Sequence, residues 1–294
     1  TGSDTEVILA AYLKWGNDCV NHLRGMFSFA IYNGKTDQVF CARDRFGIKP
    51  FYYYQNNGVF YFASEVKALI PFLDEIETNE TALNEYLFFQ MGLGYETLFK
   101  DIKQLSPAHT LTISNGELAF KKYWEVYYNL DFDHTQKYFD EKLQELLYDS
   151  IKYHTVSDVP IGAYVSGGID SGVIASVANK EKSVEDELMA FTGKFSVGDL
   201  YDESMFAEKL AEKANIKLLQ KDIKEHDFVN NIEKIIYHLD YPVAGPGSFP
   251  QYEVSELAAK YRKVVLGGQG GDEIFGGYTR YLIAYFEQCI KAGI

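Results

Sequence analysis

The length, composition and charge of the chain already exclude several classes of protein. At 294 residues, of which 47% are hydrophobic, the chain is long enough for two globular domains. Its net charge of −14 argues against nucleic acid or an anionic membrane as a partner, so we expect small-molecule ligands. Cys19, Cys41 and Cys289 are far apart and form no C-x-x-C pair, which indicates neither a disulfide framework nor a zinc site. No signal peptide or long apolar run is present, so the expected location is the cytoplasm.

The first 123 residues are predicted to form a helix followed by a β-rich layer. Residues 3–6 have the S-x-x-E spacing of a capping box, so a helix is expected to start there. The apolar runs that follow pair around Asn-Gly dipeptides, which favour β-hairpins because both residues accept positive φ angles. The expected strands span 26–32, 38–42, 51–54, 59–63 and the two arms of 109–123, with Asn-Gly turns at 33–34, 57–58 and 115–116. A short helix is expected within 80–95, and the polar residues 124–134 are expected to form a linker.

From residue 136 onward the pattern changes to helices that alternate with short apolar strands. The strands are expected at 161–165, 188–192, 216–219 and 263–266. The helices are expected from 136, from 172, at 203–214, 228–239 and 251–261, and as one long helix at the end. Strands that alternate with helices predict a parallel sheet with helices on both faces. The expected fold class is therefore α/β, with a β-rich domain at 1–123 and a parallel-sheet domain at 135–294.

A glycine-rich turn connects the expected strand at 161–165 to the helix after it. Its sequence is Ser166-Gly167-Gly168-Ile169-Asp170-Ser171. Glycines let the backbone approach a ligand closely, and the N–H groups and dipole at the start of a helix attract an anion. Asp170 would repel a phosphate unless a divalent cation lies between them, most simply Mg²⁺ carried in with a nucleotide. The loop has no lysine, so it is not the G-x-x-x-x-G-K-[ST] phosphate loop, and the alternative is an ordinary strand–helix turn.

A second acidic glycine loop follows the expected strand at 263–266. It comprises residues 267–278, with the sequence GGQGGDEIFGGY. In an open parallel sheet, ligands bind at the carboxyl ends of the strands, where the strand order reverses. Asp170 and Asp272 are therefore expected to face one another across a nucleotide and to share its Mg²⁺. The alternative is a glycine turn in which Asp272 and Glu273 open the next helix favourably against its dipole.

These loops and several other segments resemble known families. Residues 166–171 are similar to the pyrophosphate-binding loop of the ATP-pyrophosphatase superfamily, whose members split ATP to AMP and pyrophosphate while they activate an acid. Residues 267–278 resemble the matching loop of glutamine-hydrolysing asparagine synthetases. The other similar segments are 201–204 and 240–248, in the synthetase domain of those enzymes, and 24–30, 43–53 and 63–69, in the class II glutamine amidotransferase domain that precedes it. The resemblance covers essentially the whole chain in the same order.

The resemblance implies a fold, an activity and its cofactors. The first domain would be the remnant of an amidotransferase of the N-terminal-nucleophile type, and the second an ATP-pyrophosphatase domain of the adenine nucleotide alpha hydrolase-like kind. Such an enzyme is a ligase that uses ATP and Mg²⁺. It activates aspartate as an acyl-adenylate and amidates it with ammonia from glutamine, which gives asparagine, AMP and pyrophosphate.

The resemblance also implies roles for single residues. The pyrophosphate of ATP and its Mg²⁺ would be held by Ser166, Gly167, Gly168, Asp170 and Ser171. The remaining nucleotide contacts would come from Val165 and Thr192, beside the adenosine, and from Gly267 and Gly268. Asp272 would bind the metal, so Asp170 and Asp272 are the catalytic candidates. In the first domain, Asp4 would bind substrate glutamine, although the residues alone equally favour a place for it in the capping box at 3–6.

Three features depart from the family pattern. The class II nucleophile is an N-terminal cysteine followed later by an Asn-Gly-Glu segment, and the printed chain has neither. Thr1 offers an N-terminal hydroxyl, but its neighbours match the interior of the family sequence. Gln269 stands where many asparagine synthetases carry Glu, and the chain ends before the later catalytic lysine. We therefore expect an internal fragment without glutaminase activity, whose unpaired strand edges favour aggregation.

Two alternatives fit the same residues. A related amide-forming ligase, such as a β-lactam synthetase, would use the same loops to activate a different acid. A non-catalytic glycine-rich α/β domain would serve as a scaffold or binding module. Binding of a nucleotide would distinguish the two enzymes from the scaffold. The acid that is activated would distinguish one enzyme from the other. The sequence does not identify that acid, because the side chains that contact it are dispersed over loops.

Overall fold

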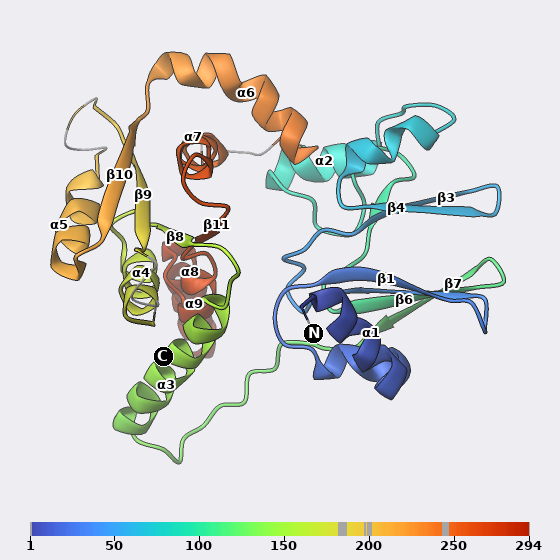
Figure 1. Cartoon of the computed structure of the whole chain (residues 1–294), viewed down its shortest axis with the longest axis horizontal. Helices are drawn as coiled ribbons and strands as arrows, with labels where there is room; N and C mark the ends of the chain where they lie inside the picture. The colour runs from blue at the N-terminus through green and yellow to red at the C-terminus, as the bar shows by residue number, and fades with distance from the viewer. Residues whose placement is uncertain (1, 182–186, 197, 199–201, 243–246, 294) are drawn as a thin grey trace. The chain divides into compact units, whose positions relative to one another are not determined.

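The computed structural model describes residues 2–181, 187–196, 198, 202–242 and 247–293 (Figure 1). Contacts between residues divide the chain into two compact units. The first comprises Thr1–Leu130 with Ile236–Ala244, and the second comprises Asp131–Ile235 with Gly245–Ile294. The expected boundaries at 123 and 135 stay a prediction. Within the described ranges, no helix is both long enough and apolar enough to cross a membrane.

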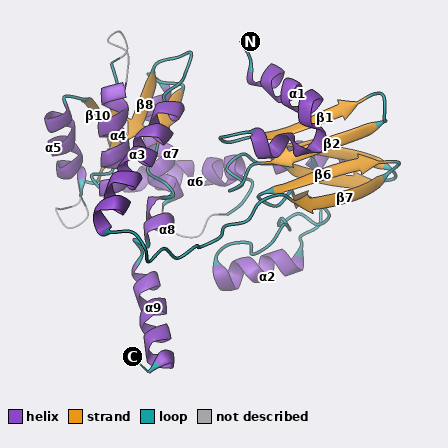
Figure 2. Ribbon diagram, turned by 90° about the horizontal axis from the view of Figure 1, so that it is seen from below, coloured by secondary structure: helices purple, strands orange, loops and turns teal. Residues whose placement is uncertain are grey.

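The first unit contains two antiparallel sheets, as its hairpin signals indicate (Figure 2). The larger sheet has the order β1-β2-β6-β7, and the smaller has the order β4-β3-β5. The strands are β1 (Ser28–Asn33), β2 (Gln38–Arg43), β3 (Tyr52–Asn56), β4 (Val59–Ala63), β5 (Lys103–Gln104), β6 (His109–Ser114) and β7 (Glu117–Lys122). The helices are α1 (Asp4–Trp15) and α2 (Glu80–Phe89), with short 3₁₀ turns at Gly16–His22, Val66–Ala68 and Ile70–Phe72.

Turn chemistry explains two of the three predicted hairpins; in the first hairpin the turn falls on residues 34–37, where Asp37, and neither Asn33 nor Gly34, is left-handed, with a φ of 49°. Asn57 and Gly58, between β3 and β4, have φ angles of 50° and 78°. Asn115 and Gly116, between β6 and β7, have φ angles of 53° and 79°. Both central residues of each turn are thus left-handed, which matches the right-handed twist of the flanking strands. The helix expected within 80–95 ends at Phe89, because Gln90 takes the left-handed conformation at a φ of 60°.

A buried carboxylate organises the loop after β2, in one of the segments that resembles amidotransferases. The side chain of Asp44 is 1% exposed. Its Oδ1 accepts the backbone N–H groups of Phe46 at 3.2 Å and Ile48 at 3.0 Å. Its Oδ2 accepts the backbone N–H of Lys49 at 2.9 Å. Because these bonds satisfy both oxygens, Asp44 is a structural residue that shapes the loop.

Arg43 supports the same loop from the other side. Its guanidinium group donates to the carbonyl oxygens of Gly47 at 2.7 Å, Lys49 at 2.9 Å and Leu105 at 2.6 Å. Gly47 has a φ of 66°, and a Cβ there would lie 2.8 Å from Cγ of Pro107. The loop therefore needs a glycine at this position for its backbone conformation and for its packing.

The second unit is built around a parallel sheet in the order β10-β9-β8-β11 (Figure 1). The strands are β8 (Ile161–Tyr164), β9 (Met189–Lys194), β10 (Lys217–Asp222) and β11 (Val264–Leu266). The helices are α3 (Gln136–His154), α4 (Ile169–Glu181), α5 (Ser204–Ala214), α6 (Glu225–Leu239), α7 (Ser248–Ala259), α8 (Gly271–Phe275) and α9 (Thr279–Ala292), and the last residues of α6, from Ile236, are assigned to the first unit. The mixed α/β fold with a parallel sheet confirms the expected fold class.

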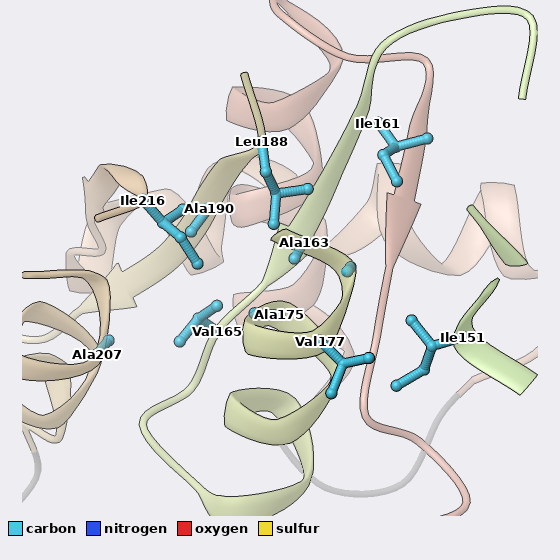
Figure 3. Packing of buried hydrophobic residues seen from close by; sticks show 11 residues of the cluster. Ile151, Ile161, Ala163, Val165, Ala175, Val177, Leu188, Ala190, Ala207 and Ile216 are labelled. Carbon is cyan, nitrogen blue, oxygen red and sulfur yellow. The ribbon is translucent and has the colours of Figure 1, made fainter. Parts of the chain in front are cut away.

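Helices cover both faces of the parallel sheet, as the alternation of strands and helices predicts. Leu188 and Ala190 belong to a hydrophobic cluster with α3, α4 and α5, whereas Met189 and Phe191 belong to a cluster with α6 and α7. Figure 3 shows the first cluster, where Val177 of α4 faces Ile151 of α3. Because successive side chains of a strand point to opposite faces, both faces of β9 are buried, which explains its continuous apolar sequence.

Replacement of Asp44 by alanine tests the buried carboxylate. The change removes a buried carboxylate that accepts three backbone N–H groups, so we expect a loss of about 3 kcal/mol in the free energy of unfolding. Asp74→Ala is the matched control, because Asp74 is exposed and accepts one hydrogen bond, from Asn56. Its expected loss is below about 1 kcal/mol. Chemical denaturation followed by circular dichroism measures both, and equal losses would contradict the assigned role.

Candidate nucleotide-binding site

The two acidic glycine loops leave the same edge of the parallel sheet. Strands β8 and β11 are hydrogen-bonded parallel neighbours, with Val264 opposite Ile161 and Leu266 opposite Ala163. From β8 the chain continues to β9 and β10 on one side of the sheet and returns to β11 on the other. The carboxyl ends of β8 and β11 therefore flank the point where the strand order reverses, which is the usual ligand site of such sheets.

Hydroxyl groups shape the first loop from within. The Oγ atoms of Ser166 and Ser171 lie 3.1 Å apart, and the backbone N–H of Ser166 donates to Oγ of Ser171 at 3.2 Å. The backbone N–H of Gly168 donates to Oγ of Ser166 at 3.3 Å. The predicted pyrophosphate-binding serines thus also close the turn and fix the direction in which helix α4 starts.

Helix α4 begins earlier than the sequence predicts. The expected start was residue 172, but the helix runs from Ile169. Asp170 and Ser171 are therefore in its first turn, where the partial positive charge of the helix dipole stabilises a carboxylate. The early start is a correction to the sequence analysis, and it places Asp170 directly at the anion-attracting end of the helix.

Gly167 brings the first loop against helix α5. Its φ is 91°, in the region that favours glycine. A Cβ there would lie 2.7 Å from Cβ of Phe206 and 3.1 Å from the carbonyl oxygen of Glu203. The first turn of α5 therefore packs on the loop, and no larger residue than glycine fits between them.

The second loop lies directly on Asp170. A Cβ on Gly268 would lie 2.8 Å from the backbone nitrogen of Ser171, and a Cβ on Gly271 would lie 2.2 Å from Oδ2 of Asp170. The structure thus brings the two loops into contact through glycine backbone. Asp272 directly follows Gly271 in the chain, so it is the neighbour of a residue that contacts Asp170.

The other predicted nucleotide contacts differ in accessibility. Val165 is 1% exposed and lies in the hydrophobic cluster of α3, α4 and α5, so a contact with adenosine would fall to its backbone. Thr192 is 4% exposed, and its Oγ1 donates to the carbonyl oxygen of Gly193 at 3.4 Å. Gly267 is half-buried, and Oε1 of the Gln269 side chain occupies the position of the missing Cβ.

In the first unit, Asp4 is the first residue of α1 and is exposed. The preceding Ser3 caps this helix, since its Oγ accepts the backbone N–H of Thr5 at 3.3 Å. Thr1, Tyr201 and the segment 243–246 lie outside the described residues.

Sequence reasoning missed the role of Glu273. Its Oε2 accepts the backbone N–H of Gly270 at 3.1 Å, and its Oε1 accepts the hydroxyl of Tyr278 at 2.8 Å. The hydrogen bond from Tyr278 lowers the pKa of Glu273 and raises the pKa of the Tyr278 hydroxyl. Gly270 and Glu273 have the spacing of the N-cap and N3 residues of a helix, where a Glu side chain can accept the N-cap N–H, and this spacing is the signal that could have identified the contact with Gly270.

A parallel sheet whose two acidic glycine loops meet at the strand switch point defines an α/β protein suited to bind a nucleotide. Comparison with known families gives a more specific assignment. A model described as Asparagine synthase matches residues 142–293, just over half of the chain, and one described as Glutamine amidotransferase domain matches residues 1–124. The chain belongs to the asparagine synthase family.

Individual relatives agree with this assignment. The chain is 38% identical over 285 residues to Asparagine synthetase (glutamine-hydrolyzing) 1 of Bacillus subtilis, a match that covers 96% of this chain and 44% of that protein. It is 36% identical over 292 residues to Putative asparagine synthetase (glutamine-hydrolyzing) 2 of Methanocaldococcus jannaschii, covering 97% and 56%. It is 28% identical over 295 residues to Amidase chyE of Penicillium rubens, covering 95% and 44%. The chain thus spans about half the length of these relatives.

Alanine substitution at the loop glycines tests the close approach of the two loops. Neither Gly268 nor Gly271 has a left-handed φ, so an added methyl group acts through steric overlap alone. We expect Gly271→Ala to lower the free energy of unfolding of the second unit by about 1–3 kcal/mol, as overpacking does elsewhere. Gly247→Ala is the control, because its Cβ meets nothing within 4 Å. Equal denaturation midpoints for the two variants would show that the loops are apart in solution.

Proposed function

We propose that the second unit binds Mg·ATP and activates the side-chain carboxylate of aspartate as an acyl-adenylate, which ammonia from glutamine converts to asparagine. The observation that carries the proposal is the contact of Gly268 and Gly271 with the first turn of α4 at Asp170. It supports one composite site at the switch point of the sheet rather than two unrelated glycine turns. Membership of the asparagine synthase family supports the choice of reaction.

The residues present fit a Mg²⁺ ion that arrives with the nucleotide. Asp170 in the first turn of α4 and Asp272, the residue after Gly271, would supply hard oxygen ligands, and Mg²⁺ in nucleotide sites is typically held by one or two carboxylates, phosphate oxygens and water. Among the described residues, no three His, Cys, Asp or Glu side chains gather into a metal site, so the protein would contribute only part of the coordination shell. When bound, the ion neutralises charge on the pyrophosphate and makes it a better leaving group.

The reaction transfers the adenylyl group to the acid and then exchanges it for an amine. An oxygen of the aspartate side-chain carboxylate attacks the α-phosphorus, and the bond from that phosphorus to the pyrophosphate oxygen breaks. Ammonia then attacks the acyl carbon, loses a proton and displaces AMP. The first turn of α4 and the glycine backbone of both loops would direct N–H groups at the phosphates, where preorganised donors stabilise the charge that develops.

The first unit would supply the ammonia by releasing it from glutamine. It matches the glutamine amidotransferase family, and Asp4 is proposed to bind the substrate glutamine. The buried Arg43 and Asp44 would contribute stability rather than chemistry, since their polar atoms are engaged by backbone groups.

A ligase for a different acid is the second candidate. The similarity to Amidase chyE of Penicillium rubens favours it, because that protein carries another name while it matches the same 95% of the chain. In both candidates the loops bind ATP in the same way, and only the acid differs.

Loss of either carboxylate tests the shared metal. We expect Asp170→Asn and Asp272→Asn each to weaken ATP binding at least about tenfold when Mg²⁺ is present. With EDTA, removal of a negative charge beside the phosphates leaves the affinity unchanged or slightly higher. Asp158→Asn, an exposed carboxylate of the same unit, is the control. Isothermal titration calorimetry makes the comparison, and unchanged Mg²⁺-dependent binding in both variants would overturn the proposal.

Pyrophosphate exchange tests the acid. In a protein that extends this chain by the segments its relatives carry beyond the match, aspartate should drive labelled pyrophosphate into ATP. Exchange needs no ammonia, because the adenylate forms before ammonia reacts. Glutamate is the control acid, since it is longer by one methylene group. Exchange with another carboxylic acid but not with aspartate would favour the second candidate.

A further inference from the structure

We propose that Glu273 and Tyr278 are positioning residues that hold the second glycine loop in the shape needed to present Asp272. The proposal rests on the proposed Mg·ATP site and adds to it two residues that do not themselves contact the nucleotide or the metal.

The carboxylate of Glu273 joins the two ends of the loop. One oxygen accepts the backbone N–H of Gly270 at 3.1 Å, and the other accepts the hydroxyl of Tyr278 at 2.8 Å. Gly270 precedes Asp272, and Tyr278 lies beyond the glycine pair that ends α8. A single side chain thus closes the loop around Asp272.

The segment around Asp272 needs such a tie. Helix α8 spans only Gly271–Phe275 and ends at Gly276, whose φ is 70°. A helix of this length is not stable by itself in water. The backbone N–H of Gly277 donates to the carbonyl oxygen of Asp272 at 2.9 Å, which closes the last turn but fixes nothing outside it.

Tyr278 provides an anchor because the following helix holds it. The guanidinium carbon of Arg280 lies 4.2 Å from the centroid of the Tyr278 ring and 5.6 Å from that of Tyr281. Tyr278 is the N-cap of α9, a helix of 14 residues, and its own hydroxyl makes no capping bond there. The hydroxyl is therefore available to Glu273, and the loop is tied to the first turn of a long helix.

The adjacent acids Asp272 and Glu273 consequently have different tasks. Both oxygens of Glu273 accept hydrogen bonds from the protein, one from the Gly270 backbone and one from the Tyr278 hydroxyl. Asp272 is exposed and is left for a metal. Without the contact between Glu273 and Tyr278, the loop would become ordered only when the ligand binds, and the entropy lost in that step would lower the affinity.

The experiment compares Tyr278→Phe with Tyr281→Phe in this chain. Both changes remove one hydroxyl beside Arg280, but only the first breaks the bond to Glu273. We expect Tyr278→Phe to weaken Mg·ATP binding about three- to tenfold in calorimetry, and Tyr281→Phe to change it less than twofold. Glu273→Gln, which keeps an acceptor oxygen, should lose less affinity than Glu273→Ala. The double variant Tyr278→Phe/Glu273→Ala should lose no more than Glu273→Ala alone, because both act through one contact.

Hydrogen exchange tests the tie without nucleotide. In Glu273→Ala and Tyr278→Phe, amides of 270–278 should exchange at least about tenfold faster than in the unchanged chain, while those of β8 keep their rates. Equal behaviour of Tyr278→Phe and Tyr281→Phe in both measurements, or multiplied losses in the double variant, would overturn the proposal. An unchanged chain that binds no Mg·ATP but shows the exchange difference would overturn the proposed function and retain the tie.

Discussion

The second unit depends on the absence of a side chain at the two positions where its loops meet. A Cβ on Gly268 would lie 2.8 Å from the backbone nitrogen of Ser171. A Cβ on Gly271 would lie 2.2 Å from a carboxylate oxygen of Asp170. This approach is possible because β8 and β11 are parallel neighbours whose carboxyl ends coincide. Helices on both faces in turn hold these strands, since β8 and β9 contribute to hydrophobic clusters on either side of the sheet.

Charge explains why the site takes this form. A chain with a net charge of −14 gains no attraction for a polyanion from its overall field. Attraction must come from nearby partial charges, which the first turn of α4 and the exposed glycine backbone supply. In the proposed site, two carboxylates near the phosphates would cancel this attraction unless a divalent cation accompanied the ligand. Glu273 adds a third negative charge next to Asp272, and its hydrogen bonds to Gly270 and Tyr278 engage its oxygens without removing that charge.

What the sequence predicts well is local or periodic. Two of the three Asn-Gly hairpins follow from the φ preferences of their central residues, and the parallel sheet follows from the alternation of strands and helices. The start of α4 at Ile169 was missed because a Gly-Gly pair normally interrupts a helix, whereas here the turn is closed by the Ser166 and Ser171 hydroxyls. The long final helix is found as α9, but the short helix α8 inside the second loop was not expected, and the role of Glu273 depends on a partner beyond the end of α8. The contact between the Ser166 and Ser171 hydroxyls and the bond from Tyr278 to Glu273 are three-dimensional contacts that the spacing of residues does not show.

The surroundings of a glycine separate structural motifs from chemical ones in this chain. At Gly47, the missing methyl group would meet the ring of Pro107 and the guanidinium of a buried arginine whose hydrogen bonds are all internal. That glycine serves packing, although it lies in a segment that resembles an enzyme domain. At Gly271, the missing methyl group would meet a carboxylate at the start of a helix, on the ligand-binding edge of a sheet. The segments around Gly47 and Gly271 both resemble parts of known enzymes. Only the segment around Gly271 lies against a titratable side chain, that of Asp170, at the carboxyl ends of the strands.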